Sequence, residues 1–181
     1  MKLLLYCTKA KPMLRKLDKY FLGKHTDNYY WKKGQTVPYN VNGKIVAECD
    51  FEVERLQIVY GKGWETKTIK GTENIEKLTC LSRDELYQYC KGNGYAIHIK
   101  NLHIFDKPRD IRNYYNIAAR TMADCMNQKA LLKAPQNMCN AYDVYKNHYI
   151  LISIKPEWLC KILNCEKTIE VRKKVLKEML E

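Results

Sequence analysis

The chain has 181 residues, of which 46% are hydrophobic and 29% are charged. A chain of this length buries an apolar core without disulfides or metals, and its composition excludes a disordered or collagen-like protein. The apolar runs fall far short of the ~20 residues that cross a bilayer, and the first residues lack the apolar region of a signal peptide. We therefore expect a single domain over residues 1–181, cytoplasmic and not bound to a membrane.

The net charge of +12 favours a polyanionic partner, and nucleic acid is the first partner to test. Residues 1–40 hold nine Lys and Arg against two Asp, whereas residues 48–89 hold six Lys and Arg against nine carboxylates. The basic part is therefore the N-terminal one. The alternative is that the charge only keeps the protein soluble.

The eight cysteines contain no C-x-x-C spacing, and four of them lie among apolar neighbours: Cys7, Cys49, Cys125 and Cys160. This pattern predicts buried, reduced thiols rather than disulfides or zinc ligands. The four histidines are dispersed and do not form a ligand set. We expect no metal site and no cofactor.

Residues 13–42 show no clear period and are interpreted as an insertion or loop excursion. They include three aromatic residues followed by two lysines, namely Tyr29, Tyr30, Trp31, Lys32 and Lys33. Rings beside cations are the arrangement that a stacking platform for single-stranded nucleic acid uses. A partly buried aromatic anchor for the insertion remains an alternative.

Residues 43–54 alternate between apolar and acidic side chains, which predicts a half-buried strand. Its carboxylates, which are typical of a solvated face, are Glu48, Asp50, Glu52 and Glu54. Ser82 and Glu85 have the spacing of a capping box, which predicts a short helix through Cys90.

Residues 95–105 predict a long strand that Lys107-Pro108 closes. Its apolar parity changes near Asn101, which indicates a bulge or bend, and bent strands are what small barrels require. Residues 110–132 have a weakly helical pattern, and residues 109–132 are interpreted as a second insertion or loop excursion.

The C-terminal part predicts a strand, a helix and a second strand. Residues 149–154 form the first strand, and Pro156 opens a short helix at its first position. Residues 168–172 resume a period of two, so that Glu170 and Arg172 share one face. A last amphipathic turn follows in residues 175–181.

This strand–helix–strand unit, residues 150–174, resembles the opening of ASCH-domain proteins, members of the PUA-like superfamily of small β-barrels. The family signature G-x-K-x-x-E-x-R falls on Cys165, Lys167, Glu170 and Arg172, and the last three match. Cys165 stands where the family has glycine. Because a left-handed conformation costs a non-glycine residue roughly 1 kcal/mol, we expect Asn164 to adopt it or the turn to differ.

The resemblance extends along the chain in an altered order. Residues 43–56 resemble the central strand of the family and residues 94–108 its closing strands, whereas residues 3–12 resemble the strand that follows the signature unit. The resemblance therefore implies an α+β fold, a circularly permuted PUA-like (ASCH) β-barrel with short flanking helices and insertions at 13–42 and 109–132. Permutation is tolerated where chain ends lie close together.

In this permuted fold we expect residues 150–172 to pack beside residues 3–8, with strand 168–172 pairing with the N-terminal strand. If the two segments meet only across two chains, the protein is a domain-swapped homodimer rather than a monomer.

Glu170 and Arg172 lie about 7 Å apart on one strand face, so they can pair, with Lys167 entering from the preceding turn. Their spacing alone is also compatible with a surface ion-pair strand. The resemblance implies a basic cleft that binds RNA or a nucleotide. We expect Ser153 and Lys155 to join the three signature side chains there.

The resemblance also leaves an enzyme as an alternative, since some ASCH proteins are amidohydrolases of acylated cytidine and others are reported as ribonucleases. Lys167 and Glu170 would then be catalytic, although the amidohydrolases have a threonine at the position of Glu170. A lysine base needs burial or a neighbouring cation, such as Arg172, to lower its pKa. A further acidic residue would come from Glu73 or Glu76. A third alternative, a protein-interaction factor of a mobile element, rests on charge alone.

Overall fold

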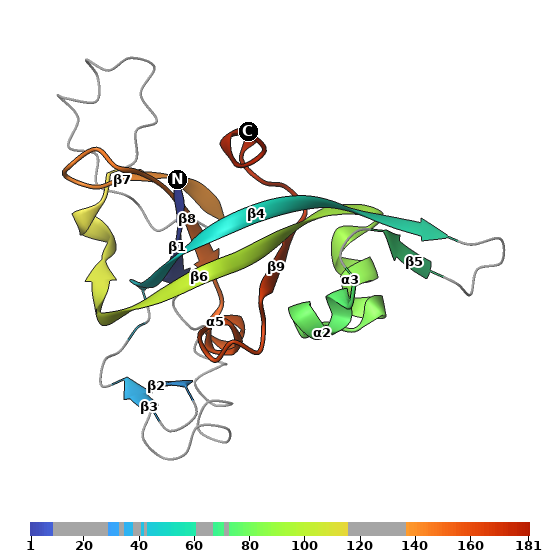
Figure 1. The fold of residues 1–181 in the computed structure, drawn as a ribbon, viewed down its shortest axis with the longest axis horizontal. Coiled ribbons are helices and arrows are strands. Elements are labelled where there is room, and N and C mark those ends of the chain that lie inside the picture. Colours follow the sequence, from blue (N-terminus) through green and yellow to red (C-terminus); the bar gives the residue numbers. More distant parts are fainter. Residues whose placement is uncertain are drawn as a thin grey trace. The chain divides into compact units, whose positions relative to one another are not determined.

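The computed structural model describes residues 1–8, 29–32, 35–37, 41, 43–60, 67–70, 73–115 and 137–181. The chain divides into two compact units, which we call unit 1 (Met1–Asp50 and Leu102–Asn164) and unit 2 (Phe51–Asn101 and Cys165–Glu181). Two long strands, β4 (Lys44–Tyr60) and β6 (Asn93–Asp110), run through both units (Figure 1).

The described strands form a seven-stranded mixed sheet in the order β7-β8-β1-β4-β6-β9, with β5 pairing with β4. The shorter strands are β1 (Lys2–Cys7), β5 (Lys67–Lys70), β7 (Met138–Tyr142), β8 (His148–Ile154) and β9 (Ile169–Arg172). Within the described residues β7 and β9 are the two ends of this order and do not pair, so the sheet is not closed. The α+β class is confirmed at this level.

In unit 1, β1 is paired along both of its edges. Its Leu4 lies opposite Leu151 of the parallel strand β8 and opposite Glu48 of the antiparallel strand β4. Residues of β8 therefore pack beside residues 3–8, as predicted. β9 pairs instead with β6, where Val171 lies opposite Ala96. The predicted pairing of strand 168–172 with the N-terminal strand is wrong, because β8 and β4 already occupy both edges of β1.

The core of unit 1 contains the buried side chains of Leu4, Ile45, Phe105 and Leu151. Helix α5 (Pro156–Leu163) follows β8 and begins with proline at its first turn, as predicted. Its buried side chains include Leu159, Ile162 and Leu163.

Parts of the two segments interpreted as insertions are described. β2 (Tyr29–Lys32) and β3 (Gln35–Val37) form a separate antiparallel hairpin. After β6, the 3-10 helix η1 (Ile111–Asn113) leads to Tyr115, which bridges to Tyr142. The rest of 13–42, apart from Val41, and residues 116–132, with the weak helical pattern assigned there, lie outside the described residues.

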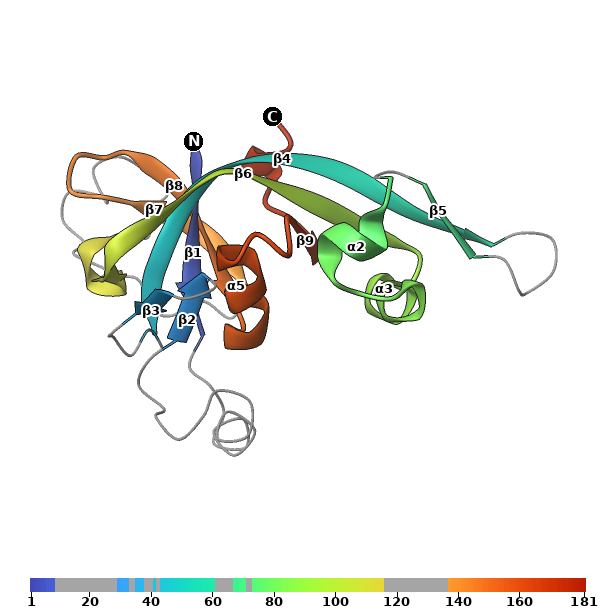
Figure 2. The ribbon, with the colours of Figure 1, turned by 60° about the horizontal axis from the view of Figure 1, so that its bottom comes forward.

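The core of unit 2 is built from strands and two helices, α2 (Ile75–Thr79) and α3 (Arg83–Cys90) (Figure 2). Its buried side chains come from β4, β6, β9 and both helices, and they are Leu56, Ile75, Leu86, Cys90, Ala96, Ile169 and Val171. The predicted capping box is confirmed: Glu85 N donates to Ser82 Oγ at 3.3 Å, and Ser82 N donates to Glu85 Oε2 at 2.8 Å. The 3-10 helix η2 (Lys177–Met179) follows β9.

Strand β6 confirms one prediction and corrects another. Asn101 has a φ of 48°, which gives a local change of direction at the position where the apolar parity changes. The strand continues through Pro108 to Asp110, so the predicted end at Lys107-Pro108 is wrong. Proline fits an extended chain and removes only one hydrogen-bond donor from the strand.

The carboxylates of β4 form a face whose side chains have lysine or histidine partners. In unit 1, Glu48 lies 3.5 Å from Lys2 Nζ and 3.7 Å from His103 Nδ1. In unit 2, Glu54 lies 3.1 Å from His98 Nε2, and Glu52 pairs with Lys100. Pairs of this kind between neighbouring strands stabilise the register in which the two side chains face each other.

Candidate functional site

The turn between α5 and β9, which precedes the signature residues, contains one residue in the left-handed conformation. Asn164, the C-cap, has a φ of −84°, whereas Cys165 has a φ of 60°. Cys165 thus takes the left-handed conformation that glycine adopts most readily after a helix. Of the two predicted alternatives, Asn164 does not adopt this conformation, and Cys165 itself does.

Two backbone hydrogen bonds fix the chain directly after Lys167. Thr168 N donates to Leu78 O at 2.9 Å, and Ile99 N donates to Thr168 O at 2.9 Å. The segment is thereby held between α2 and β6, and the side chain of Lys167 is directed into unit 2, where only 2% of it is exposed.

The Lys167 ammonium group has two oxygen partners in this interior. Nζ donates to the carbonyl oxygen of Thr79 at 3.0 Å and lies 3.4 Å from Glu170 Oε2. The other carboxylate oxygen of Glu170 lies 3.0 Å from an Arg172 guanidinium nitrogen. Glu170 therefore bridges the two cations, and we call these three side chains the signature cluster.

The signature cluster is buried, because the exposed fractions of the Glu170 and Arg172 side chains are 11% and 13%. This excludes the surface ion-pair strand that spacing alone allowed. In such surroundings charges interact more strongly than in water, but each has lost most of its hydration. The arrangement therefore depends on all three charges being present.

Burial lowers the pKa of the Lys167 amine, and the nearby Glu170 carboxylate opposes this shift by favouring the ammonium form. Arg172 contributes a smaller lowering of the same pKa. The direction is the one that a lysine general base requires, and burial rather than the neighbouring guanidinium is its main cause.

A tyrosine that sequence reasoning missed lies against this cluster. Arg172 donates a hydrogen bond to the phenol oxygen of Tyr89 on α3, and Lys173 Nζ lies 5.4 Å from the centroid of the Tyr89 ring. Burial raises the pKa of the Tyr89 phenol, and Arg172 acts in the opposite direction. The run Arg172-Lys173-Lys174 was visible in the sequence, but its proximity to α3 was not.

Gly94 allows α3 and β9 to approach each other across β6. A Cβ atom at this position would lie 2.7 Å from Cys90 Sγ and 3.4 Å from the carbonyl oxygen of Arg172. The last turn of α3, which carries Tyr89, is therefore packed directly beside the end of β9.

Ser153 and Lys155 lie in unit 1, outside the unit that holds the signature cluster. Ser153 is buried in β8 and its N donates to Asn137 O at 2.7 Å, while Lys155 is exposed at the start of α5. Their contribution to one site with Lys167 stays a prediction.

The basic aromatic segment is described only in part. The backbone of Tyr30, Trp31 and Lys32 belongs to β2, but their side chains, and all of Lys33, lie outside the described residues. The stacking platform therefore stays a prediction. Of the two candidate acids, Glu73 is exposed and Glu76 pairs with Arg83 at 3.4 Å.

The described cysteines are all free thiols. Cys7 and Cys49 are buried, as predicted, and burial raises the pKa of each to about 12. Cys160 is half-buried, and Cys125 lies outside the described residues. A search of the described part of the chain finds no group of three His, Cys, Asp or Glu side chains placed to hold a metal.

Comparisons with protein-family models, curated proteins and solved structures find no significant match to the chain. The resemblance to the ASCH family therefore rests on the motif and strand order described above. In the described residues, no helix has both the length and the apolar character needed to cross a membrane.

Proposed function

We propose that the protein binds RNA or a nucleotide through a circularly permuted, PUA-like module of the ASCH type. The observation that carries the proposal is the buried Lys167–Glu170–Arg172 network, which follows a left-handed turn at Cys165. The turn has the backbone conformation for which the family signature has glycine. The net charge of +12 and the parallel pairing of β8 with β1 also support the proposal.

The three side chains have different roles in this proposal. Lys167 is held by the Thr79 carbonyl and is almost fully buried, so it positions Glu170 rather than contacting the ligand first. Glu170 accepts hydrogen bonds from the amino groups of a base, and Arg172 donates to base acceptors or to a phosphate. Because the Glu170 carboxylate and the Arg172 guanidinium lie side by side, one base edge could donate to the carboxylate and accept from the guanidinium.

The test is a titration of labelled single-stranded RNA and of free nucleotides, followed by fluorescence anisotropy at several salt concentrations. Glu170→Gln is expected to weaken binding at least tenfold, and Lys167→Met is expected to do the same, because it removes the ammonium group that orients the Glu170 carboxylate. Glu76→Gln is the matched control, because Glu76 also lies 3.4 Å from a cationic side chain in unit 2, but at the surface.

Phosphate contacts should make log K fall with log salt by about 0.7 per contact on a single strand. The slope should stay nearly unchanged in Glu170→Gln, because base contacts release no counterions. Binding in which Glu170→Gln equals Glu76→Gln, in a variant that remains folded by circular dichroism, would contradict the proposal. Absence of RNA and nucleotide binding by the wild type at low salt would also contradict it.

A hydrolase is the second candidate, favoured by the lowered pKa of the Lys167 amine. In an enzyme, the Lys167 amine would take a proton from the water that attacks the acyl group, or from the 2′-hydroxyl that attacks the RNA phosphate, and would return it to the leaving nitrogen or oxygen as that bond breaks, with Glu170 stabilising the intervening ammonium form. Glu170 in place of the threonine of the amidohydrolases counts against the first substrate. Chromatography of acylated cytidine and RNA after incubation tests it: turnover that Lys167→Met abolishes supports an enzyme. No observation in the described residues supports the third alternative, a protein-interaction factor of a mobile element.

A further inference from the structure

We infer that Tyr89 and Lys173 form a stacking site for one nucleotide of single-stranded RNA, with the Tyr89 ring receiving the base and Lys173 the phosphate. The inference rests on the proposed function but uses residues outside the signature cluster. It names a stacking surface that lies directly against that cluster through Arg172.

Tyr89 is 40% exposed, so its ring reaches the surface although it stands on a helix that packs against a core. The same helix directs Leu86 and Cys90 into the core of unit 2. Tyr89 is therefore not needed to fill that core, and its ring is available at the surface.

The Tyr89 phenol has a contact within unit 2 before any ligand arrives. Its phenol oxygen accepts a hydrogen bond from Arg172, and Arg172 is itself paired with Glu170 at 3.0 Å. An aromatic side chain with such a contact, and with only two side-chain torsions, loses less conformational entropy when a base stacks on it than a long flexible side chain does.

Lys173 is placed to contact the phosphate of the nucleotide whose base stacks on Tyr89. Its ammonium group lies 5.4 Å from the ring centroid, and both side chains are exposed. A cation–π contact at an exposed position is weak, so a base can displace the ammonium group from the ring. The flexible lysine side chain then remains within reach of the backbone of the same nucleotide.

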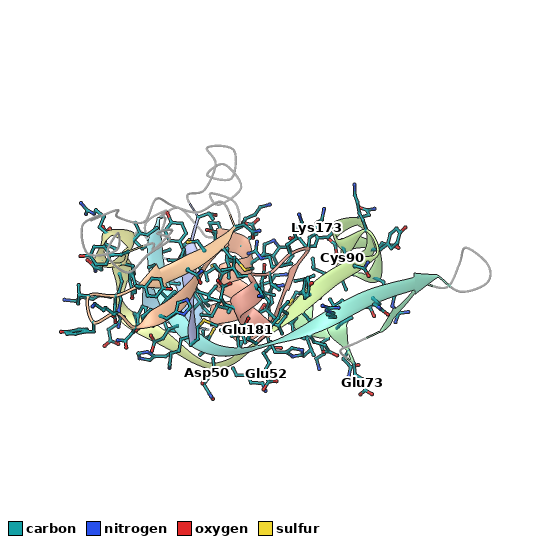
Figure 3. All side chains as sticks on the ribbon, turned by 90° about the horizontal axis from the view of Figure 1, so that it is seen from above. Asp50, Glu52, Glu73, Cys90, Lys173 and Glu181 are labelled. Carbon is teal, nitrogen blue, oxygen red and sulfur yellow. The ribbon has the colours of Figure 1, made fainter. Side chains whose placement is uncertain are left out.

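The surrounding charge favours an anion. Lys91 follows Tyr89 at the end of α3, and Lys174 follows Lys173, and both are exposed. Figure 3 shows Lys173 and Cys90 on one side of unit 2 and Glu52 and Glu73 on the opposite side. Lys91, Lys173 and Lys174 lie close to Tyr89 in the sequence or in space, so this part of the surface attracts a phosphate backbone more than a cationic peptide.

The experiment measures binding of a fluorescein-labelled ten-nucleotide uridine RNA to the full chain, by anisotropy at low salt. Tyr89→Leu keeps an apolar side chain but removes the ring, and it is expected to weaken binding by between about 5-fold and 150-fold, the effect of losing one stacked base. Tyr89→Phe keeps the ring and should stay within about 3-fold of wild type. Tyr145→Leu is the control, because Tyr145 is an even more exposed tyrosine, 83% accessible, in unit 1.

The phosphate contact is tested by Lys173→Gln against Lys146→Gln, an exposed lysine of unit 1. Lys173→Gln should reduce the salt slope by about 0.7, whereas Lys146→Gln should leave it unchanged. If Tyr89→Leu binds like Tyr145→Leu while Glu170→Gln, shown to be folded by circular dichroism, is impaired, the stacking site is wrong and the proposed function stands. If Tyr89→Leu alone is impaired, the stacking site stands and the signature cluster is not the recognition element. If wild type binds no RNA, both are wrong.

Discussion

Removal of the Glu170 charge should destabilise the protein strongly, because Glu170 is the carboxylate that both Lys167 and Arg172 contact. Glu170→Gln keeps the shape of the side chain and one carbonyl acceptor, and it leaves two cations that are only 2% and 13% exposed facing a neutral amide. Breaking a buried ion pair by removing one partner costs about 3–5 kcal/mol. We expect a loss in this range in the free energy of unfolding at pH 7.

Glu76→Gln is the matched control for burial. The Glu76–Arg83 pair has the same 3.4 Å separation as Glu170–Lys167, but its side chains are 46% and 60% exposed. Exposed pairs contribute about 0–1 kcal/mol, so this variant should unfold at nearly the urea concentration of wild type.

The assay is urea unfolding followed by circular dichroism, with the midpoint and the slope both fitted. The double variant Lys167→Met, Glu170→Gln should be less destabilised than the sum of the two single variants, by a coupling energy of about 0.5–3 kcal/mol. If Glu170→Gln loses no more stability than Glu76→Gln, the reasoning that burial makes the cluster interdependent is refuted.

Two further predictions use the shifted pKa values. Between the lowered pKa of Lys167 and the ordinary value of 10.5, the folded protein binds fewer protons than the unfolded chain, so the stability of wild type relative to Lys167→Met should rise with pH across that interval. Urea unfolding of both proteins from pH 7 to 10 measures it, and a constant difference would contradict the shift. The buried thiols of Cys7 and Cys49, with pKa values of about 12, should react with a thiol reagent far more slowly than exposed Cys165. Peptide mapping by mass spectrometry measures the three reaction rates. Equal rates would contradict the burial of Cys7 and Cys49.

Elements with local signals were predictable from the sequence. The capping box of Ser82 and Glu85 and the proline at the start of α5 define helix ends through contacts within one turn, and the structure has both helices there. Strand β6 likewise bends at Asn101, where the alternation of apolar residues changes phase.

Strand partners were less predictable, because pairing depends on which sheet edges remain open. The resemblance placed strand 168–172 on β1, but β1 has β8 and β4 on its two edges, and β9 pairs with β6. The burial of Lys167 was equally inaccessible, since the Thr79 carbonyl that holds it comes from a distant segment of the chain. Tyr89 was missed for the same reason: its contact with Arg172 exists only after α3 packs beside β9.

Cys165→Gly is expected to stabilise the protein by roughly 1 kcal/mol, because Cys165 has a φ of 60° and glycine adopts this conformation without strain. Cys165→Ala removes the thiol but keeps Cβ, so it should give no such gain. Asn164→Gly should reduce stability, since Asn164 has a φ of −84° and glycine there only adds freedom to the unfolded chain. Urea unfolding of the three variants separates strain from thiol chemistry. Equal stability of the Gly and Ala variants would show that the turn is unstrained, and the glycine position of the signature would then carry no structural support for the resemblance.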